Sequence, residues 1–456
     1  MDYDLLIRDG RVLALDGQVA ADVAVADGVV AAVGPALSGS AATELDAGGL
    51  HVLPGGIDAH VHCDEPGRTA WEGFATASAA LAVGGLTAFV DMPINSTPAT
   101  TDTEAFARKV AAARAHSRLD FALWGGLVPG NVEELTGLHE AGAIGFKAFI
   151  SETGMEDFRP SDDVTLLHGM RRIAELDSIL AVHAENYALV ETGRARAMAE
   201  GRHDARSYLD SRPASAELEA IGRVIAFARE TGCRLHIVHV STAEGITLVT
   251  GAQAAGVDVS WETAPHYLCL TDADVIALGP IAKCAPVMRG AGNRDRLWEH
   301  VASGPDAIVA SDHSPCAPAM KDTEDFFAAW GGITGCQSTL NVLLDGVGRG
   351  RLTLERACAA VAGNVAARLR LPQKGAIAVG RDADLAVVDL GVSWSLTAEE
   401  LRYRHPFSAL VGAPMRGAVR HVYSRGRAIV ADGELVGDAR GELLRPVAAG
   451  QGALAC

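Results

Sequence analysis

The chain has 456 residues, of which 49% are hydrophobic and 21% charged, so it can bury one large core and a smaller second one. Its formal net charge of -18 argues against a nucleic-acid partner, because phosphate binding needs a basic surface. Cysteines without a C-x-x-C pair, no basic leader and no apolar run of about 18 residues together predict a cytoplasmic protein with reduced thiols and no membrane span.

Both ends of the sequence predict short strands. Residues 3–33 consist of short apolar stretches, and the same texture returns after residue 371. Dipeptides or tripeptides typical of turns separate these stretches at Asp9-Gly10, Asp16-Gly17, Asp27-Gly28, Gly380-Arg381-Asp382 and Asp432-Gly433. We expect residues 1–53 and 371–456 to build one small antiparallel sheet domain, a β-sandwich, beside a catalytic domain of residues 54–370.

Between these ends, apolar strands alternate with longer helical stretches, which is the pattern of βα units in an α/β fold. Eight strands are predicted at Val52–His62, Thr87–Asn95, Asp120–Leu127, Ala143–Ile150, Ser178–Glu185, Arg234–Ser241, Val257–His266 and Ala307–His313. One intervening helix has an apolar stripe from Leu218 to Ala228 and ends before Gly232, a typical C-terminal cap. Eight parallel strands predict a (β/α)8 TIM barrel, whose catalytic groups lie at the carboxyl ends of its strands.

The first and fourth strands carry side chains that suggest metal chemistry. The first ends in His60-Val61-His62, and alternation along a strand turns both imidazoles to one face. The fourth places Lys147 in an apolar run, where burial would lower its pKa and leave a neutral amine able to capture CO2 as a carbamate. Such an anion can bridge two cations; a lysine that extends its amine to solvent is the alternative.

The fifth, sixth and eighth strands add residues of the same kind. His183 lies near the end of the fifth, His239 near the end of the sixth, and Asp312 near the end of the eighth, where it could also move protons. His236, three residues before His239, is expected to face the opposite side of its strand. Each residue alone has an ordinary explanation in packing or turns. Together they predict a binuclear metal centre at the barrel mouth, held by His60, His62, Lys147, His183, His239 and Asp312.

Motifs along nearly the whole chain resemble those of the cyclic amidohydrolases, a family that includes dihydroorotases, hydantoinases (dihydropyrimidinases) and allantoinases. They are Pro54 to His62, the lysine of strand four, Ser311-Asp312-His313, and Gly380 to Leu385. The resemblance implies metal-dependent opening of a cyclic amide and, commonly, a homotetramer. The implied ligands are His60, His62 and Asp312 for one ion, His183 and His239 for the other, and carboxylated Lys147 between them. Zn2+ suits these ligands, as do manganese, cobalt, iron and nickel.

Within the family, several segments resemble the allantoinase branch. Dihydroorotases typically have an arginine two residues after the second histidine, where this chain has Asp64. Hydantoinases typically have a tyrosine shortly after the metal lysine, which residues 148–153 lack. Residues 92–100, 311–316 with Lys321, and 329–333 also resemble allantoinases. The branch implies hydrolysis of allantoin to allantoate in purine catabolism, with Asp312 as the catalytic proton carrier. A hydantoinase is the main alternative, followed by a dihydroorotase and then by a non-catalytic relative.

Residues that touch the cyclic ureide substrate are predicted less directly. Cys284 and Trp330 match substrate-contacting segments of the family, although packing explains both equally well. Asn95 and Ser314 are candidates for polar contacts, but loop residues of these types often satisfy turns. Arg68 either holds the ureido carbonyl of the substrate or braces its own loop. His266 and His313 are expected at most to support the metal ligands.

Overall fold

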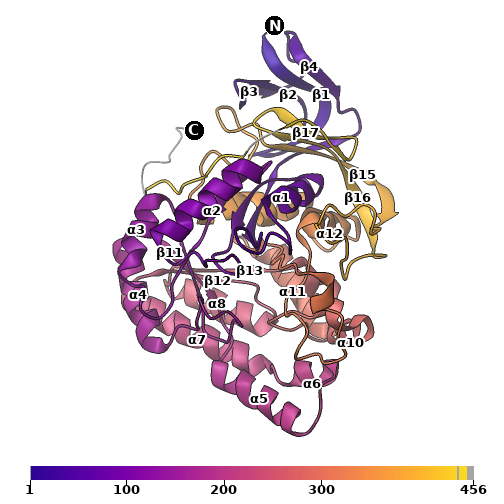
Figure 1. The fold of residues 1–456 in the computed structure, drawn as a ribbon. Coiled ribbons are helices and arrows are strands. Elements are labelled where there is room, and N and C mark those ends of the chain that lie inside the picture. Colours follow the sequence, from indigo (N-terminus) through magenta and orange to yellow (C-terminus); the bar gives the residue numbers. More distant parts are fainter. Residues whose placement is uncertain (1, 439–440, 449–456) are drawn as a thin grey trace.

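The computed structural model describes residues 2–438 and 441–448. Strands from both ends of the sequence gather at one pole, and the helices and parallel strands form the rest of the molecule (Figure 1). No helix in this described part is both long and apolar enough to cross a membrane. The seven described cysteines are free thiols, and Cys456 lies outside the described residues.

The two ends of the chain share one nine-stranded sheet. Its order is β18-β17-β16-β15-β5-β1-β2-β3, and β4 pairs with β1 beside this path. The strands are β1 Tyr3–Ala14, β2 Gly17–Ala26, β3 Val29–Gly34, β4 Ala41–Asp46, β5 His51–Pro54, β15 Leu385–Ser395, β16 Pro414–Ser424, β17 Arg427–Ala431 and β18 Glu434–Leu435. Because β4 and β5 both run parallel to β1, the expectation of a purely antiparallel sheet was wrong.

One predicted turn in this sheet was also wrong. Asp16-Gly17 and Asp27-Gly28 do separate strands, but β1 continues through Asp9-Gly10. The register against β2 shifts between Ile7 and Gly10, and Asp9 has a φ of 56°. The carboxylate of Asp22 accepts a hydrogen bond from the Asp9 N–H at 2.9 Å. Asp9-Gly10 therefore forms a β-bulge, whose free N–H is bonded by Asp22, and not the hairpin turn that this dipeptide indicated.

The predicted parallel strands all occur in the expected order, but they are shorter than expected. One sheet runs β14-β13-β12-β11-β10-β9 and another runs β6-β7-β8. The strands are β6 Gly56–Val61, β7 Leu86–Asp91, β8 Asp120–Leu123, β9 Gly125–Gly126, β10 Phe146–Phe149, β11 Ile179–His183, β12 Arg234–Ile237, β13 Val259–Thr263 and β14 Ile308–Val309. Only Trp124 separates β8 from β9, and a parallel bridge joins Val61 to His313 beyond the end of β14.

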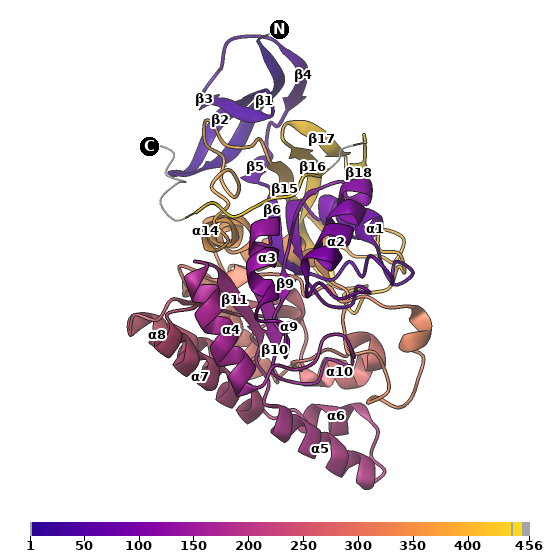
Figure 2. The ribbon, with the colours of Figure 1, turned by 60° about the vertical axis from the view of Figure 1, so that its left-hand side comes forward.

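Helices flank these strands on the outside (Figure 2). They are α1 Phe74–Val83, α2 Thr103–His116, α3 Glu134–Ala141, α4 Asp163–Glu175, α5 Tyr187–Ala199, α6 Ala205–Asp210, α7 Ala214–Thr231, α8 Ala243–Ala254, α9 Pro265–Cys269, α10 Asp272–Leu278, α11 Ala291–Ser303, α12 Thr339–Gly348, α13 Leu354–Cys358 and α14 Asn364–Arg368, with short 3-10 turns at Gly279–Ala282, Pro318–Met320 and Cys336–Ser338 and a π turn at Ala359–Gly363. Helix α7 buries the predicted stripe except Leu218, which is half-buried, and Gly232 caps it with a φ of 71°.

A buried lysine joins the parallel strands to the shared sheet. Lys374 Nζ lies 2.7 Å from a carboxylate oxygen of Asp120 on β8, 2.8 Å from one of Asp382 and 2.7 Å from one of Asp384. Burial opposes the charge on Lys374, but the carboxylates, Asp384 foremost, raise its pKa above the ordinary value. These carboxylates are close enough together to hold a metal ion, but the Lys374 ammonium group already lies within 2.8 Å of each of them.

Candidate functional site

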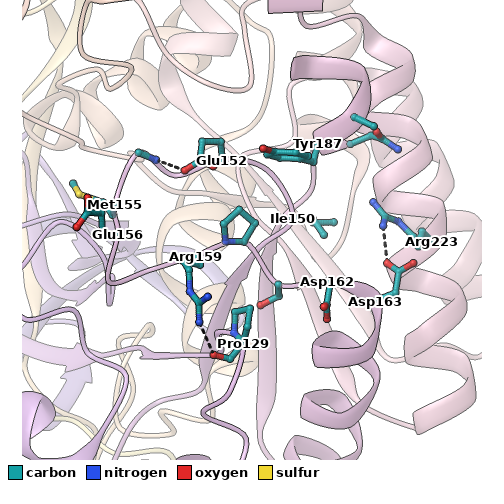
Figure 3. A pocket seen from close by; sticks show the side chains of 15 residues that line it. Pro129, Ile150, Glu152, Met155, Glu156, Arg159, Asp162, Asp163, Tyr187 and Arg223 are labelled. Carbon is teal, nitrogen blue, oxygen red and sulfur yellow. Dashed lines mark hydrogen bonds and ion pairs between the residues drawn. The ribbon is translucent and has the colours of Figure 1, made fainter. Parts of the chain in front are cut away.

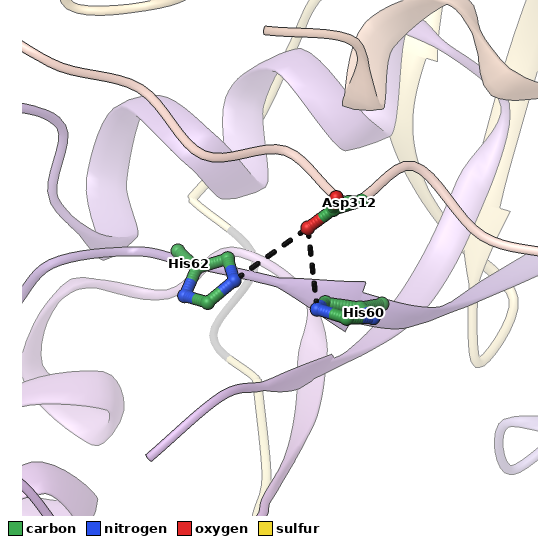
Figure 4. A group of neighbouring side chains, drawn as sticks. All are labelled: His60, His62 and Asp312. Atoms are coloured by element: carbon green, nitrogen blue, oxygen red, sulfur yellow. Dashed lines mark ion pairs between the residues drawn. The ribbon is translucent and has the colours of Figure 1, made fainter. Parts of the chain in front are cut away.

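His60, His62 and Asp312 converge at one end of the parallel strands (Figure 4). The two histidines follow the alternation of β6, and Asp312 lies beyond β14 with a φ of 47°. Asp312 Oδ1 is 3.2 Å from His60 Nε2 and 3.7 Å from His62 Nε2. All three side chains are buried, so their nitrogen and oxygen atoms face one another with little competition from water.

His183 and His239 form a second pair beside this group. His183 is the last residue of β11, and His239 lies two residues beyond β12 with a φ of 38°. His183 Nδ1 and His239 Nε2 are 3.0 Å apart, and the His239 ring centre is 5.3 Å from that of His60. Burial first, and then neighbouring Lys147 and histidines, lower the pKa of His60 and His239 well below the usual range. These imidazoles are therefore neutral, which is the form that binds metals.

The prediction that His236 turns away from the site was wrong. Regular β12 ends at Ile237, so the positive φ at His239 breaks the alternation on which that prediction relied. His236 Nε2 donates to Glu262 at 3.0 Å, and Glu262 also accepts from His60 Nδ1 at 2.6 Å. His236 is thus linked to the site through one carboxylate.

Lys147 lies in β10 among apolar neighbours with its side chain fully buried. Its Nζ has no hydrogen-bond partner in the described part of the chain and lies 4.8 Å from the ring centre of Phe149. Burial lowers the pKa of Lys147 to about 7, although the carboxylates of Glu262 and Asp312 oppose this shift. A large share of these amines is therefore neutral and nucleophilic near neutral pH.

Two acidic residues outside the predicted set orient the histidines. Glu262 on β13 holds His60, and Glu185 accepts from His183 Nε2 at 2.9 Å. Burial alone would raise the pKa of Glu185, but Arg212, 2.5 Å away, and the bond from His183 lower it to about 2. Both residues lie in predicted strands, and an acidic residue inside an apolar strand was a usable signal. Arg212 precedes α7 and gave no such signal.

The donor atoms at this site fit a pair of divalent cations. Lys147 Nζ is a buried polar atom without a partner among the described residues, an arrangement that costs free energy unless something binds there. Nitrogen and carboxylate oxygen donors are the ligands of zinc and of similar transition metals. The carboxylates of Glu262 and Glu185 fix which ring nitrogen of His60 and His183 is left free for a metal.

A cavity of about 500 Å³ opens onto these histidines and Asp312. Of the predicted substrate contacts, Asn95, Ser314 and Trp330 line it. Trp330 Nε1 donates to the Ser314 carbonyl at 3.3 Å, and its ring meets that of Trp71 edge-on with centres 4.9 Å apart. This contact joins the loop after β6 to the loop after β14 at the cavity wall.

Arg68 and Cys284 are placed differently. Neither is among the described residues that line this cavity. Arg68 Nη1 donates to the Asn95 carbonyl at 2.8 Å, and its guanidinium lies 5.0 Å from the Trp71 ring centre. The Cys284 thiol donates to the Pro286 carbonyl at 3.1 Å, and the Cys284 carbonyl accepts from Tyr208 Oη at 3.1 Å. Arg68 therefore braces its loop, and the neighbours of Cys284 reach the cavity instead.

His266 and His313 are buried near the strand ends. His313 Nε2 lies 3.5 Å from Glu72, on the other side of the chain from the histidines that Asp312 approaches. Burial lowers the pKa of His266 to about 4, so this imidazole is neutral. Both residues therefore lie around the site and are not among the candidate metal ligands.

A larger cavity of about 890 Å³ lies beside the first and shares Glu152 and Gly154 with it (Figure 3). Its charged walls are largely engaged with neighbours: Arg223 pairs with Asp163 at 2.7 Å, and Arg159 donates to the Pro129 carbonyl at 3.4 Å. None of its described lining residues belongs to the candidate metal ligands. Chemistry therefore points to the smaller cavity as the functional site.

Comparisons with known proteins agree with this geometry. The model of the Amidohydrolase family matches residues 51–429. A protein of Rubrobacter xylanophilus named allantoinase is 52% identical over 97% of this chain and 98% of its own length. One of Solibacter usitatus with the same name is 51% identical over 98% and 97% of the two chains. The structure of L-hydantoinase (dihydropyrimidinase) from Arthrobacter aurescens superposes with a TM-score of 0.94 at 35% identity, covering 97% of this chain and 99% of that one.

Proposed function

Because this chain belongs to the amidohydrolase family, we propose that it hydrolyses the cyclic amide of allantoin to allantoate in purine catabolism. Relatives of nearly full length that carry the name allantoinase support this substrate. The observation that carries the proposal is the buried group of His60, His62 and Asp312 beside His183, His239 and the unpartnered Lys147, at the wall of a cavity large enough for a small ring.

Two divalent cations complete this site in the proposal, zinc in the first place and manganese, cobalt, iron or nickel as alternatives. His60, His62 and Asp312 would hold one, and His183 with His239 the other. Bound there, the cations would lower the pKa of water and polarise the scissile carbonyl. The neutral amine of Lys147 would add CO2 and lose a proton, and the carbamate so formed would bridge them. The burial of Lys147 among apolar side chains supports this modification.

Side chains of the protein would carry out proton transfer and keep the histidines oriented. Asp312, within ion-pair distance of His60 and His62, would accept the proton of the attacking water and deliver it to the departing ring nitrogen. The oxygen of that water joins the carbonyl carbon as the C–N bond breaks, so one water is consumed for each ring opened. Glu262 and Glu185 hold His60 and His183 in one orientation throughout, so the donor set needs no rearrangement.

The proposal also includes the domain architecture and the oligomeric state of the protein. We infer that the parallel strands close into a (β/α)8 barrel of residues 54–370, and the bridge from Val61 to His313 supports closure. Residues 1–53 and 371–456 would form the β-sandwich domain, supported by their shared nine-stranded sheet. A cytoplasmic homotetramer completes the proposal; light scattering of the purified protein would measure its mass in solution.

A substrate panel tests the activity. Purified protein is assayed with allantoin, hydantoin, dihydrouracil and dihydroorotate under the same conditions, and allantoin is expected to have the highest kcat/KM. A hydantoinase is the second candidate, favoured by the close superposition on the Arthrobacter enzyme. Faster opening of hydantoin or dihydrouracil than of allantoin would assign the chain to that activity instead.

A further inference from the structure

Among the residues that the structure describes, three lysine or arginine side chains line the cavity of the proposed active site: Arg194, Arg212 and Lys283. Each arginine has a counter-ion, since Arg194 pairs with Glu191 at 3.1 Å and Arg212 with Glu185 at 2.5 Å. Lys283 differs from both. No carboxylate in the described part of the chain lies within ion-pair distance of it, although its side chain is only 4% exposed.

Main-chain oxygens hold Lys283 in place. Its Nζ donates to the Ala329 carbonyl at 2.5 Å and to the Phe327 carbonyl at 3.2 Å. An ammonium group has three N–H donors, so one remains after these two bonds. The ring centre of Tyr208 lies 4.7 Å from Nζ and stabilises the charge without supplying a carbonyl or carboxylate oxygen. The remaining donor is therefore available to an oxygen of a molecule in the cavity.

A second lysine fixes the frame that presents Lys283. The three N–H donors of Lys321 lie within hydrogen-bond distance of four carbonyl oxygens, so one donor is shared between two of them. These carbonyls belong to Pro280 at 2.8 Å, Lys283 at 3.3 Å, Trp330 at 2.9 Å and Gly332 at 2.6 Å. These bonds tie the segment that carries Lys283 to the loop that carries Trp330. Lys321 itself is not among the described residues that line the cavity, whereas Lys283 is. Lys321 therefore holds the two segments together, and Lys283 is the lysine that a bound molecule can contact.

We propose that Lys283 recognises the ureido group of allantoin by donating a hydrogen bond to its carbonyl oxygen. This inference rests on the proposed function. Arg68, the other candidate for this contact, already donates to the Asn95 carbonyl and lies outside the cavity lining. A neutral carbonyl suits a buried cation that has no counter-ion, because no carboxylate has to be displaced when the substrate enters. The ureido group is what distinguishes allantoin from hydantoin, so Lys283 sets specificity within the cyclic ureides.

The test compares a substrate that has the ureido group with a ligand that lacks it. Wild type, Lys283→Met, Lys283→Arg and Lys321→Met are assayed for kcat and KM with allantoin. Hydantoin is titrated into the same assays as a competitive inhibitor, so its inhibition constant is obtained whether or not it is turned over. Thermal melting of each variant reports whether the fold is kept.

Loss of one charge-assisted hydrogen bond predicts a rise of about 10- to 100-fold in KM for allantoin in Lys283→Met, with a smaller change in kcat because the ureido group is remote from the broken bond. The inhibition constant of hydantoin should change by less than about threefold. Lys283→Arg should recover part of the loss because it keeps the charge. The matched control Lys321→Met should weaken both ligands together and lower the melting temperature.

Two outcomes overturn the inference while leaving the proposed function in place. Equal weakening of allantoin and hydantoin in Lys283→Met would mean that Lys283 only supports the loop, and an unchanged KM for allantoin would mean that it does not touch the substrate. Wild-type protein that leaves allantoin intact would instead refute the proposed function, and this inference with it. The wild-type and variant assays therefore separate the two failures.

Discussion

The carboxylate of Glu262 on β13 lies 2.6 Å from Nδ1 of His60 on β6 and, through its other oxygen, 3.0 Å from Nε2 of His236. Both imidazoles donate to the same group, so both depend on its two acceptor oxygens. Glu262 therefore couples three strands, β6, β12 and β13, next to the proposed metal ligands.

Glu262→Gln should weaken metal binding. Glutamine offers only one acceptor oxygen, so either His60 or His236 would face an amide N–H and lose its partner. We expect metal affinity or activity to fall about 10- to 100-fold, measured by competition with a chromophoric chelator and by kcat/KM. Glu217→Gln is the control, since that buried carboxylate bonds Ser241 rather than a proposed ligand; an equal loss of metal affinity in the control would contradict the role of Glu262.

If Lys147 carries the proposed carbamate, Lys147→Ala should remove the anion proposed to bridge the two cations. Loss of a residue that only hydrogen-bonds to a metal ligand typically lowers activity by up to roughly 100-fold, and we expect a larger fall here. Elemental analysis should also show less bound metal. A short carboxylic acid supplied in the buffer should restore part of the activity, because it can occupy the space of the missing side chain. Full activity and full metal content in this variant would refute the carbamate.

The KM for allantoin should rise as pH increases through neutrality. Burial first, and then Lys321, Arg212 and Arg194, lower the pKa of Lys283 to about 7, while Asp325 opposes them. Above that pH the amine has two N–H donors, and the carbonyls of Phe327 and Ala329 take both. Below it the third donor is present.

The control for this pH dependence is Lys283→Arg, because a guanidinium keeps its charge over the whole range. Its KM should stay flat between about pH 6 and pH 9, whereas the wild-type KM rises. The comparison uses KM rather than kcat, because KM reports the proposed contact between Lys283 and the substrate. Parallel profiles for the two proteins would assign the pH dependence to another group.

Lys374→Met should destabilise the whole protein without changing the chemistry of the site. It removes the buried ammonium group from Asp384 and leaves Asp120 paired with Arg425 at 3.1 Å, at a cost of about 3–5 kcal/mol in the free energy of unfolding. Denaturant titration measures this loss, and kcat of the folded fraction should be unchanged. Arg349→Ala, which breaks the surface pair with Asp345, should cost only about 0.3–0.5 kcal/mol.

Much of the site could be predicted because its signals are local. His60 and His62 are separated by one residue on a strand, and a lysine inside an apolar strand is unusual enough to stand out. The order of the parallel strands followed from alternating strands and helices. The roles of these residues in metal binding stay predictions until metal content and activity are measured.

The rest depends on contacts that no local pattern contains. Lys283 becomes distinctive only when the carbonyls of Phe327 and Ala329 approach it, and the pairing of Arg212 with Glu185 is equally non-local. The bulge at Asp9 requires Asp22 from the next strand. His236 was misplaced because regular alternation was assumed beyond the end of β12. Errors therefore fall where tertiary contacts override a local rule.

Strand β5 lies between β1 and β15, and Val52 pairs with Val387. During synthesis on the ribosome, β5 emerges long before its neighbour, with a delay on the order of tens of seconds at about 5–20 residues per second. Its outer edge has free N–H and C=O groups for that whole interval, and such an edge can pair with another nascent chain. Translation speed and chaperone supply thus bear on the yield of this protein through a strand pair that contributes no candidate metal ligand.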